Sequence, residues 1–213
     1  MIIAIDGPAA SGKGTLGKLV AAHYRFAYLD TGTLYRAVAR DTVARGEDPA
    51  DPGAALASAK LLDPSTLGDP ALRGPGLGEA ASLVAKHSEV RRALLAYQRA
   101  IAYAKPGAVL DGRDIGTVIC PEAEVKLFVT AAPEERARRR YLELREAGMA
   151  ISEADVLADV RRRDERDAGR AAAPLRRAPD AHLLDTTNLD IDAAFRAAID
   201  LIDAAMGRAG YAS

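Results

Sequence analysis

The stretch "GPAASGKGT" occupies Gly7–Thr15 and follows the apolar run Met1–Ile5 and a single aspartate, Asp6. It nearly matches the phosphate-binding pattern G-x-x-x-x-G-K-[ST], but Gly14 stands where the pattern has a hydroxyl residue. In this pattern a buried strand leads into a loop whose backbone N–H groups converge on phosphate oxygens, and the next helix adds its positive end. The sequence therefore predicts a strand, a phosphate-binding loop and a helix in that order.

The residues of this loop, which we call the donor loop (Gly7–Thr15), have separate roles. Gly7 and Gly12 allow close approach of the backbone, and Lys13 reaches the outer phosphates. In the usual pattern the hydroxyl residue after the lysine binds Mg²⁺ directly, whereas here a hydroxyl arrives one position later, at Thr15. We expect contacts with ATP from Gly7, Pro8, Ala9, Ala10, Ser11, Gly12, Lys13, Gly14 and Thr15.

The composition is that of an ordinary globular protein. The chain has 213 residues, of which 49% are hydrophobic and 28% charged, and its net charge is −1. This balance gives no support to nucleic-acid binding, and no apolar run approaches the length of a membrane span. The chain begins without a signal-peptide pattern, and Cys120 has no partner cysteine for a disulfide. We expect a cytoplasmic monomer that contacts neither nucleic acid nor membrane.

Strand-like runs alternate with helical patterns along the chain. The strand candidates are Ile2–Ile5, Phe26–Asp30, Ala108–Gly112, Val125–Ala131 and Ala181–Thr187. Helical patterns follow the donor loop and cover Gly32–Gly46, Glu79–Ala104 (one long or broken helix), Pro133–Gly148, Ser152–Arg163 and Asp192–Gly207. Such alternation predicts an α/β fold of three layers, α/β/α, with a central parallel sheet in a single domain over residues 1–213.

Two segments depart from this alternation. Glu47–Gly78 contains five prolines and, counting Gly46, six glycines, which predicts turns and short helical pieces outside the core and no strand. The second is "RRRDERDAGR", whose last residue is Arg170 and in which Arg163, Arg166, Asp167 and Arg170 share one face if the segment is helical throughout. By itself this face fits either a solvated, salt-bridged helix or a clamp for phosphate.

The "GKGT" ending of the donor loop resembles the nucleoside monophosphate kinases, in which the metal is held largely through waters and substrate phosphates. Mg²⁺ gives up its waters reluctantly, so a site with few direct protein ligands is chemically reasonable. We expect no direct metal ligand, but water-mediated Mg²⁺ near Thr15 and Asp111, the latter at the end of a predicted strand.

Within these kinases the chain is most similar to the bacterial cytidylate kinase family, over nearly its whole length. Five stretches carry the resemblance in order: "IDGPAASGKGTL", "YLDTGTLYR", "SLVAKHSEVRRALLAYQR", "DGRDIGTVICPEAEVKLFVTA" and "RRRDERDAGRAAAPL". The resemblance implies transfer of the γ-phosphoryl group of ATP to CMP or dCMP with Mg²⁺. It also implies a mostly helical insert for the acceptor nucleotide at about residues 37–105 and a short arginine-rich lid at about residues 150–172, both within the P-loop kinase domain.

The same resemblance assigns the residues of the site. It implies catalytic roles for Lys13, Arg113, Arg163 and Arg170, and a contact of Arg166 with ATP. The residues that it implies for CMP binding are Thr31, Arg36, Ser82, Arg91, Asp111, Arg113, Asp114, Asp167 and Arg170. A base-contacting loop for the donor adenine is implied after "LLDTT", without a named residue.

Recognition of cytosine follows from its hydrogen-bonding edge. Cytosine offers an amino donor at N4, and we expect Asp114 to accept from it, while Arg91 and Ser82 donate toward N3 and O2. Uracil has a carbonyl at position 4 and would face Asp114 lone pair to lone pair, so the base would be rejected.

Two alternatives stay open at the level of the sequence. One is a P-loop kinase of another small acceptor, namely AMP, UMP or shikimate. The other is a nucleotide-sensing ATPase without kinase activity, which would have one nucleotide site rather than two. The segment between Ala57 and Ser82 is also shorter than the corresponding segment of the familiar long-form bacterial enzymes. Contacts made by that part of the family pattern therefore do not transfer to this chain.

Overall fold

The computed structural model describes residues 1–74 and 76–208. Its described residues form a five-stranded parallel sheet in the order β2-β3-β1-β4-β5. The strands are β1 (Ile2–Asp6), β2 (Ala27–Asp30), β3 (Ala108–Gly112), β4 (Val125–Thr130) and β5 (His182–Asp185). The parallel sheet predicted from the sequence is confirmed, and β1, which leads into the donor loop, lies at its centre.

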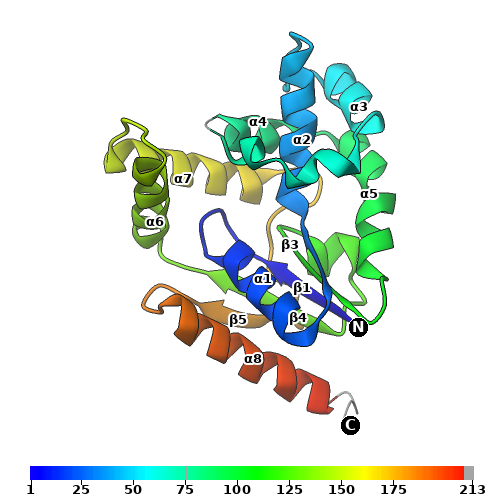
Figure 1. Ribbon diagram of the computed structural model, residues 1–213, viewed down its shortest axis with the longest axis vertical. Coiled ribbons are helices and arrows are strands. Elements are labelled where there is room, and N and C mark those ends of the chain that lie inside the picture. The colour runs from blue at the N-terminus through cyan, green and yellow to red at the C-terminus, as the bar shows by residue number, and fades with distance from the viewer. Residues whose placement is uncertain (75, 209–213) are drawn as a thin grey trace.

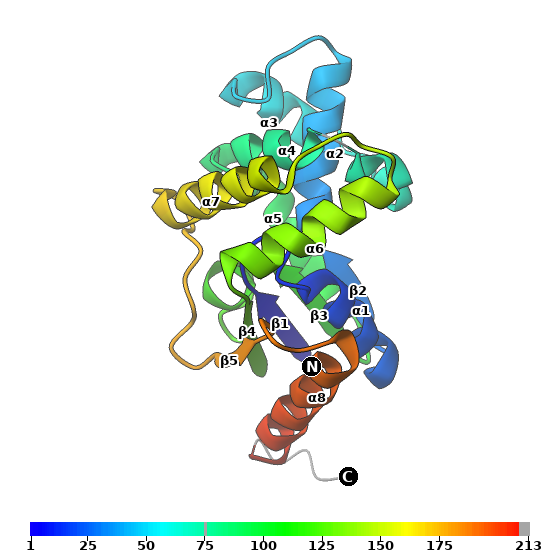
Figure 2. The ribbon, with the colours of Figure 1, turned by 90° about the vertical axis from the view of Figure 1, so that its left-hand side faces the viewer.

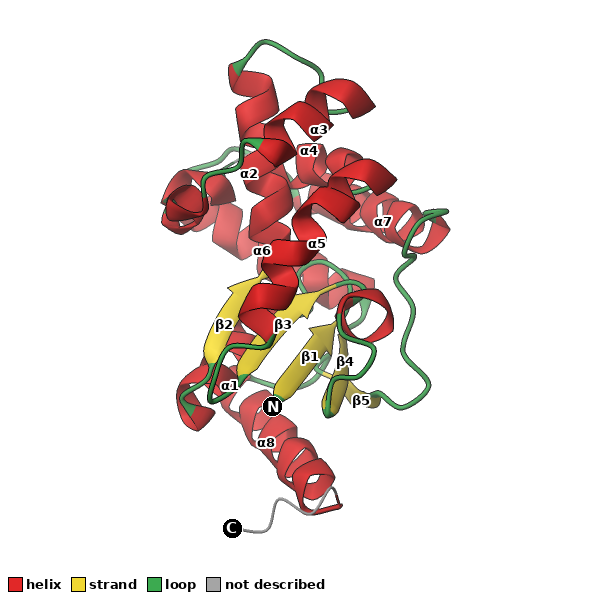
Figure 3. Cartoon of the chain, turned by 90° about the vertical axis from the view of Figure 1, so that its right-hand side faces the viewer, coloured by secondary structure: helices red, strands yellow, loops and turns green. Residues whose placement is uncertain are grey.

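Alternation along β1 divides the core into two halves. Ile3 and Ile5 pack against α1 (Lys13–Tyr24) and α8 (Ile191–Arg208) on one face of the sheet. Ile2 and Ala4 belong to the core on the other face, which α5 (Ser88–Ala102) covers. This core continues beyond the strand ends into the helices α2 (Thr31–Ala44), α3 (Pro52–Lys60) and α4 (Leu77–Val84). Helices thus cover both faces, as the three-layer prediction requires (Figures 1 and 3).

The strands point toward a helical part of the molecule (Figure 3). This part contains α2, α3 and α4, together with α6 (Pro133–Glu146) and α7 (Glu153–Gly169). Helices α6 and α7 lie side by side (Figure 2) and pack through Ala137, Val156 and Val160. All five carboxyl ends therefore open into the space between the sheet and these helices.

Two helix boundaries differ from the predicted ones. The pattern at Glu79–Ala104 resolves into α4 and α5, with a break at residues 85–87. The helix that begins after Ser152 extends to Gly169 rather than ending at Arg163. Its predicted capping signature is confirmed, because the Ser152 hydroxyl accepts a hydrogen bond of 3.1 Å from the Asp155 amide.

The proline-rich segment does contribute to the core, so that part of the prediction was wrong. Ala55 and Ala59 of α3 and the nearby Leu72 are buried. The described residues of this segment form α3, the 3-10 turns Pro64–Gly68 and Pro70–Arg73, and the start of α4, with no strand, as predicted.

Three Asp-Pro pairs explain how this segment folds. Asp51, Asp63 and Asp69 each accept a hydrogen bond from a backbone amide, and each is followed by a proline at the first position of the helix or turn. Proline is well suited to that position because its missing N–H is not needed there. The prolines therefore begin short helices, and small alanines let α3 pack closely.

The predicted division of the chain maps onto these elements. The predicted insert, residues 37–105, runs from within α2 past the end of α5, and the predicted lid, residues 150–172, consists mainly of α7. The predicted domain, residues 1–213, includes residues 75 and 209–213, which lie outside the described residues. Within the described part of the chain, no helix is long and apolar enough to cross a membrane.

The close approach of the donor loop to β4 generates a prediction. An ideal Cβ at Gly7 would lie 2.0 Å from the carbonyl oxygen of Val129, which is backbone and cannot rotate away. We predict that Gly7→Ala lowers the free energy of unfolding by about 1–3 kcal/mol, measured by chemical denaturation. Gly68→Ala is the control, because a Cβ there meets no atom within 4 Å. Equal stabilities of the two variants would contradict the contact.

Candidate active site

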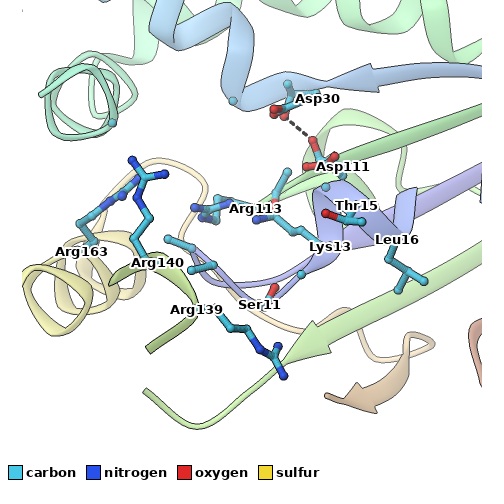
Figure 4. A pocket seen from close by; sticks show the side chains of 18 of the residues that line it. Ser11, Lys13, Thr15, Leu16, Asp30, Asp111, Arg113, Arg139, Arg140 and Arg163 are labelled. Carbon is cyan, nitrogen blue, oxygen red and sulfur yellow. Dashed lines mark hydrogen bonds between the residues drawn. The ribbon is translucent and has the colours of Figure 1, made fainter. Parts of the chain in front are cut away.

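A cavity of about 730 Å³ opens at the carboxyl ends of the strands. Its walls come from the donor loop, the first turn of α2, α4, the residues after β3, and helices α6 and α7 (Figure 4). Parallel pairing places Asp30 of β2 opposite Asp111 of β3, so two carboxyl groups meet at one wall. A site of this kind, outside the carboxyl ends of a parallel sheet, is where α/β proteins bind their ligands.

The donor loop curls around the start of α1. Gly12 precedes the helix with a φ of 85°, and Ala10 also has a positive φ, of 58°. Of the nine predicted ATP-contacting loop residues, those from Ala9 to Thr15 line the cavity, whereas Gly7 and Pro8 do not. The Lys13 ammonium group is buried and donates to the carbonyl oxygen of Pro8 at 3.2 Å.

Charges at the base of the cavity shift one another's pKa values. Burial and the neighbouring Arg113 lower the pKa of Lys13 to about 7. Burial and the carboxylate of Asp30 raise the pKa of Asp111 to about 6. An added anion would stabilise the charged form of Lys13, and an added cation would stabilise the charged form of Asp111.

The residues around Gly14 fit a hydrated magnesium ion. The Tyr28 hydroxyl donates to the carboxylate of Asp111 and, at 3.2 Å, to the carbonyl oxygen of Gly14. An ideal Cβ at Gly14 would lie 3.8 Å from both the Tyr28 hydroxyl and Asp111 Oδ2, which is ordinary van der Waals contact. Thr15, which carries the nearby hydroxyl group, is exposed and lines the same cavity (Figure 4). A few oxygen donors in an open setting suit Mg²⁺, which retains most of its waters.

The far wall of the cavity carries a buried ion pair. Arg91 on α5 donates to the carboxylate of Asp114, and both side chains are buried. Burial raises the pKa of Asp114, although the charge of Arg91 opposes this. Within the described residues, Ser82 Oγ and the Nε and Nη2 atoms of Arg170 are buried without a hydrogen-bond partner. Unsatisfied polar groups of this kind cost free energy, so a polar ligand that paired with them would be stabilised.

Thr31 and Arg36, both predicted to contact the acceptor, line the wall between these two regions. The Thr31 hydroxyl donates to the carbonyl oxygen of Asp111 at 2.8 Å. Arg36 is paired with Asp30 at 2.5 Å, and Arg36 lowers the pKa of that carboxyl even though burial opposes it. Arg36 Nε has no partner among the described residues.

Three of the four lid residues named from the sequence line the cavity, namely Arg163, Asp167 and Arg170. Arg113, after β3, donates to Asp167 at 2.8 Å, and burial and Arg113 together lower the pKa of Arg163. Figure 4 shows Arg113 between Lys13 and Arg163. Arg170 follows the end of α7 rather than continuing its face, yet it is buried against the same cavity. A cluster of guanidinium groups of this kind suits a ligand with several negative charges.

Arg166 is placed differently. It does not line the cavity but pairs with Glu79 on α4. The four residues therefore do not form one continuous ligand-facing surface, because α7 ends at Gly169 and the helix turns Arg166 toward α4.

Sequence reasoning missed several residues of the cavity. Arg139 and Arg140 of α6 line it, and so do Tyr28 and Asp30 of β2. Arg139 donates to the Thr186 carbonyl oxygen at 2.7 Å, next to the segment where the resemblance puts an adenine-contacting loop. The run "RARRR" in α6 was the available signal, but a run of arginines on a helix is usually a solvated face.

The chain is similar to known proteins over nearly its whole length. A family model described as cytidylate kinase matches residues 3–204. A cytidylate kinase from Nitrobacter winogradskyi is 59% identical over 212 residues, covering 100% of both chains. One from Afipia carboxidovorans is 60% identical over 205 residues, covering 96% of this chain and 98% of that one. The crystal structure of an uncharacterized protein from Eubacterium ventriosum aligns with a TM-score of 0.57 at 16% identity, covering 95% of this chain and 98% of that chain, which bears on the fold alone.

The low pKa of Lys13 predicts a pH dependence of nucleotide binding. With a pKa of about 7, free Lys13 loses its charge as the pH rises above 7, and a bound diphosphate favours the charged form. The affinity for ADP should therefore fall between about pH 7 and pH 9, by up to roughly tenfold per pH unit, when measured by calorimetry. In Lys13→Arg the side chain stays charged over this range, so the slope should disappear. An equal slope in both proteins would contradict the assignment.

Proposed function

This chain belongs to the cytidylate kinase family, and we propose that it transfers the γ-phosphoryl group of ATP to CMP and dCMP, giving ADP and CDP or dCDP. The observation that carries the proposal is a single cavity with two differently built ends. One end is the donor loop, and the other is the buried set of Arg91, Asp114 and Ser82. A nucleoside triphosphate at the first end and a nucleoside monophosphate at the second would bring their phosphates together in the middle.

The cations between the two ends suit the transfer step. The γ-phosphoryl group spreads its negative charge over three oxygens in the transition state, and positioned arginines can accelerate such reactions by about 10³–10⁵. Lys13 lies at the donor loop, and Arg113 and Arg163 line the middle of the same cavity. The attacking oxygen of CMP belongs to a phosphate that is already anionic near neutral pH, so the reaction needs no general base.

Magnesium completes the proposal as cofactor. When bound, Mg²⁺ neutralises charge on the donor phosphates. Thr15 and Asp111 would hold it through waters, and the Tyr28 hydroxyl keeps the Asp111 carboxylate in place.

The lid provides the remaining part of the mechanism. Arg163, Asp167 and Arg170 belong to or follow α7, which packs against α4 of the predicted insert. Movement of α7 would carry these side chains toward or away from the phosphates and would exclude water that could otherwise hydrolyse ATP.

We propose that the enzyme acts as a cytoplasmic monomer.

Base selection rests on the buried ion pair. The Asp114 carboxylate can accept a hydrogen bond from the N4 amino group of cytosine, while Arg91 and the unpaired Ser82 hydroxyl can donate to N3 and O2. Uracil would place its O4 carbonyl against the carboxylate, and two acceptors repel.

An acceptor panel tests the function directly. ADP release should be measured with Mg²⁺, ATP and, in turn, CMP, dCMP, UMP, AMP and shikimate. We expect kcat/KM to be highest for CMP and dCMP, because only cytosine complements the carboxylate and its neighbours. Turnover of AMP or shikimate comparable to that of CMP would contradict the cytosine assignment, and ATP hydrolysis indifferent to every acceptor would favour a nucleotide-sensing ATPase.

Asp114→Asn tests the account of base selection. The amide can turn either its oxygen or its NH₂ group toward position 4, so it pairs with cytosine or uracil. We predict that the ratio of kcat/KM for CMP to that for UMP falls by about 10- to 100-fold, as expected for the loss of one well-placed base contact. The KM for ATP, whose site is at the other end of the cavity, serves as the internal control. An unchanged ratio would remove this account.

A further inference from the structure

Arg136 is a buried arginine that takes no part in the site described so far. It lies in the first turn of α6, its side chain is only 4% exposed, and it does not line the cavity. Figure 2 shows α6 and α7 packed alongside one another. A fully buried guanidinium group is unusual and is found where its donors are satisfied by specific partners.

The partners of Arg136 come from three parts of the molecule. Its Nε atom donates to the carbonyl oxygen of Ala131, after β4, at 2.9 Å. Its Nη1 atom donates to the carbonyl oxygen of Ala9 in the donor loop at 3.2 Å. Both terminal nitrogens bind the carboxylate of Asp164 on α7, at 3.0 and 2.6 Å. One side chain thus joins the sheet, the donor loop and the lid helix.

Stability alone does not account for this arrangement. Taking charges out of water is costly, and apolar replacements of a buried ion pair are often equally stable. What the pair adds is geometry, since a bidentate arginine–carboxylate contact fixes both distance and orientation. Asp164 is adjacent to Arg163 and one helical turn from Asp167, so its position sets how α7 presents those residues to the cavity.

We propose that Arg136 is a positioning residue that couples occupation of the donor loop to the placement of α7. A nucleotide bound in the loop fixes the backbone at Ala9, Arg136 transmits that geometry to Asp164, and α7 then holds Arg163 and Arg170 against the acceptor. Donor binding therefore raises the affinity for CMP. The inference rests on the proposed function, because it concerns the same two nucleotides.

A second ion pair between the same helices provides a matched control. Arg161 of α7 donates to Glu134 of α6 at 2.8 Å, and both side chains are more than half exposed. Glu134 precedes Arg136 by two residues, but its pair reaches neither the donor loop nor the cavity. If any link between α6 and α7 were sufficient, breaking this pair would have the same effect as breaking the buried one.

The experiment measures the dissociation constant of CMP by calorimetry, with and without saturating Mg²⁺ and a non-hydrolysable ATP analogue. For the wild type we expect the analogue to tighten CMP binding by about tenfold, within the usual range of coupling between sites. For Asp164→Asn we expect this factor to fall to about twofold or less, with the affinity for CMP alone little changed. Glu134→Gln should keep the wild-type factor.

A purely structural role would lower the thermal unfolding midpoint and leave the coupling factor unchanged, and that result would overturn the inference. The double variant Arg136→Met with Asp164→Leu guards against a folding defect, because it removes both charges together. It should fold and should also lose the coupling, whereas full coupling in it would overturn the inference. If the wild type binds CMP without any effect of the analogue, the inference fails alone, and if it does not bind CMP at all, the proposed function fails with it.

Discussion

The buried ammonium group of Lys13 shares its cavity with several guanidinium groups, Arg113 among them, and with the carboxyl groups of Asp30, Asp111 and Asp167. Burial and the charge of Arg113 lower the pKa of Lys13 to about 7, and burial and the charge of Asp30 raise the pKa of Asp111 to about 6. Both shifts are reversed by the same kind of ligand, a polyphosphate that carries a divalent cation. A ligand that carries charges of both signs would therefore favour the charged forms of Lys13 and Asp111 together.

Parallel strands are the reason why these charges meet. Each strand delivers its carboxyl end to the same edge of the sheet, so residues far apart in sequence, such as Asp30 and Asp111, become neighbours in register. The helices that follow β4 in the chain carry several of the arginines. Among these, Arg140 of α6 and Arg163 of α7 line the cavity at that edge of the sheet. Two differently built ends of the cavity follow from this layout, because β1 leads into the donor loop and β3 leads into Arg113 and Asp114.

The sequence predicted the sheet and its helical covering, and most of the site residues named from the sequence do line the cavity. Strong local signals explain this success: an apolar run, a glycine-rich loop and the start of a helix lie together at Met1–Leu16. Other features depend on tertiary contacts that no local pattern records. Ala55 looked like part of a turn-rich insert, since alanine carries little periodic signal. No local pattern distinguishes Arg136 from the other arginines of α6, because its partners at Ala9 and Asp164 are 127 and 28 residues away in the sequence.

The proposed reaction requires two nucleotide sites that share one cavity. A dinucleotide in which five phosphates join adenosine to cytidine spans both ends, and its affinity measured by calorimetry tests that claim most directly. We predict that it binds with one molecule per chain, at least about 100-fold more tightly than ATP, and displaces both ATP and CMP. An affinity no greater than that of ATP, or CMP that still binds beside it, would contradict the account.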